Sequence, residues 1–122
     1  MRGAWLIAPL LIAPLLVVAH GAGAQPVGLD AAVQSARAHA AKHTGQAAQS
    51  FELVKAQAVT WPDGSLGCPQ PGMNYTMALV PGYRIQLRAK GSAVMDYHAS
   101  DTGALVLCPA SRSVEPVPDS RT

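Results

Sequence analysis

The chain has 122 residues, a formal net charge of +2 and a hydrophobic fraction of 49%. Nine basic residues stand against seven acidic ones, and no basic run or aromatic ladder accompanies them, so nucleic acid is not expected as a partner. A chain of this length, less any leader, has room for one small domain and excludes a second.

Residues 1–24 have the three parts of a secretory signal peptide. Arg2 supplies the positive charge, residues 5–19 are almost all apolar, and residues 22–24 (Ala-Gly-Ala) form a small-residue cleavage site. The alternative is a retained membrane anchor. The apolar run is only about 15 residues long and contains prolines, whereas a spanning helix needs about 20 residues. We therefore expect cleavage before Gln25 and a periplasmic or extracellular protein that is not bound to the membrane.

Residues 29–44 predict one amphipathic helix of about four turns, because apolar residues recur there at a spacing of three to four. Thr44 and Gly45 supply the stop signal. The positions of this stripe are Leu29, Val33, Ala36 and Ala40. Because alanine dominates the stripe, the helix should approach closely the surface that it covers.

His39 and His43 lie four residues apart on this helix and would share a face, which is the spacing of a two-histidine metal grip. No Glu and no third ligand accompany them. Histidines near the C-terminus of a helix are also favoured by the helix dipole without any metal. We therefore expect no metal site and no cofactor.

Residues 61–72 (WPDGSLGCPQPG) predict an ordered loop around which the domain is organised. Three prolines fix φ, three glycines permit unusual backbone conformations, and Asp63-Gly64 is a turn dipeptide. The loop holds Cys68, whose one possible partner is Cys108. Two cysteines in an exported chain usually form a disulfide, and their spacing suits a redox pair or a zinc site poorly. We therefore expect a Cys68–Cys108 disulfide.

Five segments carry strand signals: residues 51–61, 73–80, 83–90, 93–100 and 104–108. Pro81-Gly82 is expected to interrupt the chain between the second and third segments. The expected fold is α+β, with the N-terminal helix packed on one face of a four-stranded antiparallel sheet. This domain covers residues 25–108. Residues 109–122 hold three prolines and few apolar groups, so we expect a disordered C-terminal tail.

The third segment alternates most strictly, which predicts one buried and one wet sheet face. Tyr83, Ile85, Leu87 and Ala89 alternate with Arg84, Gln86, Arg88 and Lys90. If Met95 and Tyr97 share the buried face, the connecting loop has an odd number of residues, and Asp96 and His98 join the arginines on the wet face. One allowed register sets Arg88 opposite Asp96 and Gln86 opposite His98.

The second half of the chain resembles a family of small exported bacterial proteins whose members have no assigned activity. The resemblance rests on residues 61–69, Pro71-Gly72, Tyr75, Val80, residues 82–85, Leu87, Gly91, Tyr97-His98 and Cys108. The chain departs from the family at Met77, where a polar Gln is expected. The order of one helix followed by hairpins is also similar to that of PepSY-type and cystatin-like domains, several of which restrain proteases; this is an analogy of fold alone.

The first function hypothesis is a non-enzymatic binding module, possible partners being exported proteins, with the domain itself expected to be a monomer. A rigid loop clamped by a disulfide binds a partner with little loss of entropy, and protease inhibitors commonly use such loops. Asp63, Ser65 and Leu66 are the candidate binding residues, and Leu66 is the apolar side chain that would project. The competing structural interpretation is a scaffold, with Trp61, Leu66 and Cys68 all pointing inward.

Two other function classes are weighed against binding through the loop. A small molecule or anion could bind the wet sheet face through Arg84, Arg88 and His98, although charged rows on strands usually serve solubility. A hydrolase would need Ser65 and His98 with an aspartate, namely Asp63, Asp96 or Asp101. No Gly-x-Ser-x-Gly motif is present. The sequence therefore predicts no enzyme activity.

Overall fold

The computed structural model describes residue 3, residues 9–15 and residues 25–119. Most of the predicted leader, including its cleavage site at residues 22–24, lies outside the described residues. Within the described part of the chain, no helix is both long enough and apolar enough to span a membrane.

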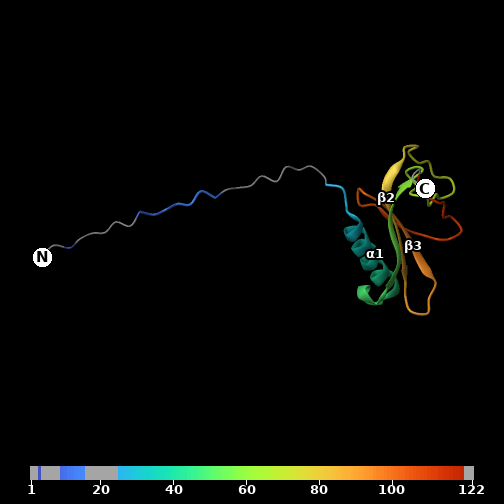
Figure 1. The fold of residues 1–122 in the computed structure, drawn as a ribbon, viewed down its shortest axis with the longest axis horizontal. Coiled ribbons are helices and arrows are strands. Elements are labelled where there is room, and N and C mark those ends of the chain that lie inside the picture. Colours follow the sequence, from blue (N-terminus) through green and yellow to red (C-terminus); the bar gives the residue numbers. More distant parts are fainter. Residues whose placement is uncertain (1–2, 4–8, 16–24, 120–122) are drawn as a thin grey trace.

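One helix and one antiparallel sheet make up the domain, which confirms the predicted α+β class. The elements are α1 (Leu29–Thr44), a 3-10 turn (Ala48–Ser50), β1 (Glu52–Trp61), β2 (Val80–Arg88), β3 (Val94–Ser100) and β4 (Leu105–Cys108). The strands are hydrogen-bonded in the order β1-β2-β3-β4. Figure 1 shows α1 along one side of the sheet, with the chain that follows β1 gathered at the upper end of the domain.

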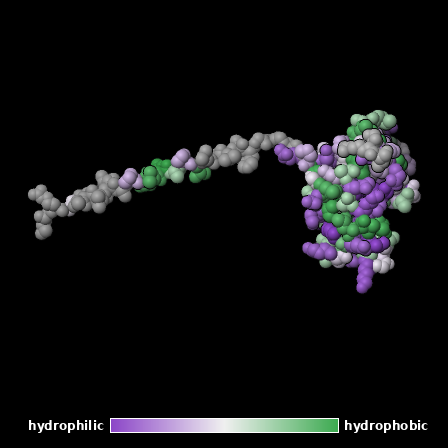
Figure 2. Space-filling view, viewed as in Figure 1, coloured by the Kyte–Doolittle hydropathy of each residue, from purple (hydrophilic) through white to green (hydrophobic). Residues whose placement is uncertain are grey.

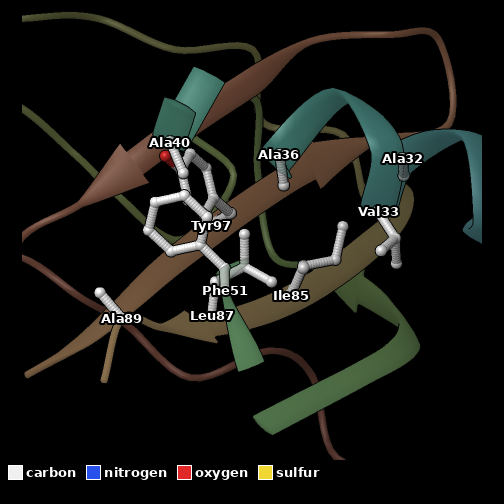
Figure 3. Close-up of a cluster of buried hydrophobic side chains, with 9 residues drawn as sticks. All are labelled: Ala32, Val33, Ala36, Ala40, Phe51, Ile85, Leu87, Ala89 and Tyr97. Carbon is white, nitrogen blue, oxygen red and sulfur yellow. The ribbon is translucent and has the colours of Figure 1, made fainter. Parts of the chain in front are cut away.

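Helix α1 has the predicted bounds, and its alanine stripe packs on the sheet. Ala36 and Ala40 are fully buried (Figure 3). The larger side chains of this core come from the sheet side: Phe51, Ile85, Leu87 and Tyr97. Small helical residues let the helix approach the sheet closely, so the sheet supplies most of the buried apolar area. At the C-terminus, Gly45 adopts φ 77° and donates its N–H to the Ala41 carbonyl.

The β2–β3 hairpin confirms the predicted parity but not the suggested register. Between the paired residues Arg88 and Val94 the loop has five residues, an odd number. Asp96 faces Gln86 instead of Arg88, and His98 faces Arg84 instead of Gln86. The loop is shorter than that register required, because Gly91 at φ 76° and a hydrogen bond from Ser92 N to Ala89 O close the turn.

The strand predicted for residues 73–80 is wrong, and so is the interruption at Pro81-Gly82. Residues 73–79 belong to no strand, and β2 runs through Pro81 and Gly82. Gly82 is required there because a Cβ at this position would collide with the carbonyl oxygen of Ala99 on β3. Glycine therefore marks a close approach of two backbones in the middle of the sheet, and does not break the strand.

Residues 109–119 lie against the domain, where sequence analysis expects a disordered tail. Val114 N donates to Gly67 O at 2.8 Å, and Val117 N donates to Thr60 O at 2.8 Å. The loop and the edge of β1 thus supply backbone partners that composition alone does not reveal. Residues 120–122 lie outside the described part of the chain.

Candidate functional site

The loop of residues 61–72 covers the sheet face opposite α1. Trp61, Leu66 and Cys68 are at most 5% exposed, and Cys68 forms the expected disulfide with Cys108. The Trp61 indole stacks on the His98 ring with centroids 4.3 Å apart, and its Nε1–H donates to Ala99 O at 2.9 Å. The face predicted to be wet is therefore covered at His98, which is fully buried.

Asp63 and Ser65 fix the turn within this loop. Asp63 Oδ1 accepts hydrogen bonds from the Ser65 N–H at 2.8 Å and from the Ser65 hydroxyl at 2.5 Å. This is the local side-chain cap that Asp-Gly turns commonly form.

Leu66 does not project into solvent as the binding hypothesis required. Its side chain is 5% exposed, and its backbone adopts φ 57°, in the left-handed region. A leucine is uncommon at positive φ, so surrounding contacts must hold it there. One such contact is the Leu66 carbonyl, which accepts a hydrogen bond from His98 Nδ1 at 2.6 Å. The tip of the loop is thus part of the core.

Asp96 is the centre of a partly buried polar cluster that joins three parts of the chain. The guanidinium of Arg84 binds its carboxylate through two nitrogens, at 3.0 and 3.1 Å. His98 Nε2 lies 3.0 Å from Asp96 Oδ2, and the Ser113 hydroxyl donates to the same oxygen at 3.4 Å. Arg84 Nη1 also reaches Glu115 Oε2 at 2.7 Å. The cluster therefore ties the C-terminal segment to β2 and β3.

The two nitrogens of His98 both face acceptors, because one partner is a carbonyl oxygen and the other a carboxylate oxygen. Asp96 lies between the guanidinium of Arg84 and the imidazole ring of His98. Such a charge-balanced arrangement can be buried where a lone carboxylate could not.

Burial opposes ionisation of Asp96, but its hydrogen bonds to His98 and Arg84 and the charges of both groups prevail. The pKa of Asp96 therefore lies well below its ordinary value of 3.8. The hydrogen bond to Asp96 in turn raises the pKa of Arg84 above its ordinary value. On the α1 side, burial raises the pKa of Tyr97 to about 12.

The residues suggested for anion binding are held by carboxylates or a carbonyl. Arg84 is shared between Asp96 and Glu115, and the more exposed Arg88 pairs with Glu52 at 3.0 Å. An anion on this face would have to compete with all these contacts.

The residues of the candidate hydrolase site are also bound to other partners. Ser65 bonds to Asp63 and His98 bonds to Asp96, with no Ser65–His98 hydrogen bond in the part of the chain that the structure describes.

His39 and His43 do share a face of α1, with their rings stacked 5.8 Å apart. His39 Nδ1 lies 2.9 Å from the Tyr97 hydroxyl, which joins the helix to β3. Over residues 3, 9–15 and 25–119, no group of three or more His, Cys, Asp or Glu side chains could hold a metal ion.

Three exposed apolar side chains lie in residues 73–79, the segment that follows Cys68 and the loop of residues 61–72. Met73 is 59% exposed, Met77 85% and Leu79 63%. Figure 2 shows hydrophobic atoms at the surface of the upper end of the domain, where Figure 1 places this part of the chain. Sequence analysis assigned this segment to a strand and so did not identify its side chains as a surface.

The backbone beneath these side chains is held in place. Thr76 O accepts a hydrogen bond from Gly64 N at 2.8 Å, and the Tyr75 hydroxyl accepts one from Gln70 N at 3.0 Å. Met73 N donates to Gln70 O at 3.2 Å. The segment of residues 73–79 is therefore fastened to the loop of residues 61–72, and its apolar side chains are presented from a defined path.

Sequence analysis also missed the part that Ser113 and Glu115 play in the cluster. The available signal was the presence of Val114 and Val117 beside Pro116 and Pro118, since prolines favour an extended chain that can follow a sheet edge. The low hydrophobicity of residues 109–122 pointed to a disordered tail instead.

Comparison with protein families shows that residues 33–108 match the model described as a domain of unknown function (DUF8738). Searches of curated proteins and of solved structures gave no match. The matched region runs from within α1 to Cys108 and so takes in most of the helix, the whole sheet and both cysteines. The chain therefore belongs to this family of domains of unknown function.

Proposed function

We propose that the protein is an exported, non-enzymatic domain that binds another protein through the exposed side chains of residues 73–79. Export is supported by the leader-like residues 1–24 and by the Cys68–Cys108 disulfide, since disulfides persist in oxidising compartments. The bacterial periplasm or the extracellular medium fits both features.

The observation that carries the proposal is the exposure of Met73, Met77 and Leu79 on a hydrogen-bonded backbone. Exposed apolar side chains grouped in one segment are typical of interaction sites, and methionine adapts its shape to a partner. Because the segment is already fixed through Gly64 and Thr76, binding would lose little backbone entropy.

This proposal moves the binding surface away from the residues that sequence analysis favoured. Leu66 and Ser65 are buried, so the loop of residues 61–72 supports the surface from beneath. Restraint of a protease by an inserted Leu66 gains no support from this geometry. Residues 73–79 would instead supply the contact with any partner, including a protease.

The test is capture of partners by the oxidised protein and by a Met73→Ser/Met77→Ser variant from the envelope fraction of cells that produce it. We expect the wild type to retain a partner that the double variant binds at least about tenfold more weakly, since each methionine buried in an interface contributes about 1 kcal/mol or more.

The matched control is Val94→Ser, which removes a 40% exposed apolar side chain from the β2–β3 hairpin. It should retain the partner, and all three proteins should have similar melting temperatures. Equal capture by the wild type and the methionine variant, or no partner for either, would contradict the proposal.

A further inference from the structure

A groove lies along the free edge of β1, and neither Met73 nor Met77 lines it. It has a volume of about 840 Å³. It is lined by residues 57–60 of β1, by Leu79 and by the C-terminal segment of residues 115–119. Pockets of this volume are large enough for peptides or small ligands.

The backbone of β1 has outward-facing hydrogen-bonding groups in this groove. β1 is an edge strand, paired with β2 on one side. On its other side Thr60 O accepts a hydrogen bond from Val117 N. Because backbone groups alternate in direction along a strand, the N–H and C=O of Ala58 point the same way as the Thr60 carbonyl. No strand in the described part of the chain pairs with this edge.

We propose that the groove binds an extended peptide segment of a partner protein, which adds to β1 as a further strand. The Val117–Thr60 hydrogen bond shows that this edge accepts an extended chain, and the peptide would continue that pairing at Ala58. The small Ala58 side chain, which is exposed, leaves the backbone accessible. This site shares Leu79 with the surface proposed above but does not depend on Met73 or Met77.

The walls of the groove define the chemistry of the peptide. Leu79 and Val117 are 63% and 39% exposed and offer apolar contacts to alternate side chains. Glu115 also lines the groove, and its carboxylate is 77% exposed beside its bond to Arg84, which favours a lysine or arginine in the peptide.

A second copy of this chain is a poorer occupant than a short peptide. Pairing of two β1 strands along their full length would bring the partner strand to Thr60, whose carbonyl is already bound by Val117. If a second copy displaced Val117 from Thr60, the lost hydrogen bond could not be replaced by the neighbours of Val117, because Pro116 and Pro118 have no N–H groups.

The test is selection of random linear peptides displayed on phage against the wild-type protein, followed by affinity measurement for the enriched peptides. We expect alternating apolar residues and at least one Lys or Arg in those peptides. Ala58→Pro removes an outward-facing N–H and should weaken binding by about tenfold or more, whereas Val94→Ser should not change it.

Backbone N-methylation of an enriched peptide gives a second measurement on the wild-type protein alone, which decides the matter should Ala58→Pro fail to fold. Only every second N–H group of the peptide faces β1, so methylation of that set should abolish binding. Methylation of the other set should change the affinity by less than about twofold. No enriched peptide, or equal effects of methylating either set, would overturn the proposal. The partner captured through Met73 and Met77 is not used here, so either proposal can fail without the other.

Discussion

Replacing Asp96 with Ala is expected to lower the free energy of unfolding by about 3 kcal/mol at neutral pH. The substitution removes the carboxylate that holds Arg84 and His98, and it leaves the largely covered guanidinium of Arg84 without its anion. The Arg84 and Asp96 side chains are 11% and 15% exposed, so water can replace little of the lost interaction. Urea unfolding of the oxidised protein measures the change.

The matched control is Arg88→Gln, which breaks the ion pair with Glu52. These side chains are 41% and 63% exposed, so we expect a loss of less than about 1 kcal/mol. A loss for Asp96→Ala no larger than that of this control would show that the partly buried cluster does not hold the C-terminal segment and the sheet together.

The same variant should change the dependence of stability on pH. The pKa of Asp96 is lowered in the folded state, so its contribution is fully present above about pH 4, near the unfolded-state pKa, and is lost as the pH falls further. Between about pH 4 and pH 2 the wild type should therefore lose more stability than Asp96→Ala. Parallel curves would contradict the ion pairs described here.

Removal of the disulfide by Cys68→Ala/Cys108→Ala is expected to lower the free energy of unfolding by about 4 kcal/mol. The bond joins residues 40 apart, and closing a loop of that length restricts the unfolded chain by about this amount. A small domain has only about 5–15 kcal/mol in total, so the variant should be close to unfolding at body temperature.

The wild type under reducing conditions is the matched comparison for the double variant, because neither has the bond. The two should unfold at similar urea concentrations, both well below the oxidised wild type. A loss of less than about 1 kcal/mol would mean that the loop of residues 61–72 is held by Trp61, Leu66 and the backbone contacts alone.

Regular patterns in the sequence were sufficient to predict much of the fold. The spacing from Leu29 to Ala40 and the stop at Thr44-Gly45 gave α1 its correct bounds. The alternation from Tyr83 to Lys90 identified most of β2 and the face that packs against α1. These patterns are local, so they survive in any tertiary context that buries one side.

The errors arose where tertiary contacts outweigh local preference. Pro81 and Gly82 usually end a strand, but here Gly82 lets β2 approach Ala99 on β3. Residues 73–79 alternate like a strand, yet the edge of β2 that they would need is already taken by β1. Composition could not show that residues 109–119 find backbone partners on the loop and on β1.

The residues that the sequence singled out for binding differ from the exposed surface of residues 73–79. The sequence singled out Asp63, Ser65, Leu66, Arg84, Arg88 and His98. The structure places five of them in or next to the layer that covers the second sheet face, and Arg88 pairs with Glu52 instead. A side chain's direction depends on what covers it, so the inward position of Leu66 could not be read from the loop sequence. The same is true of the exposure of Met73 and Met77.

Amide hydrogen exchange, resolved by residue in the oxidised protein, tests most directly the claim that a fixed loop supports a preformed binding surface. Gly64 N–H, which bonds to Thr76 O, and Val114 N–H, which bonds to Gly67 O, should be strongly protected. Exchange of both amides at the rate of an unstructured peptide would contradict the account, since residues 73–79 would then have no fixed support.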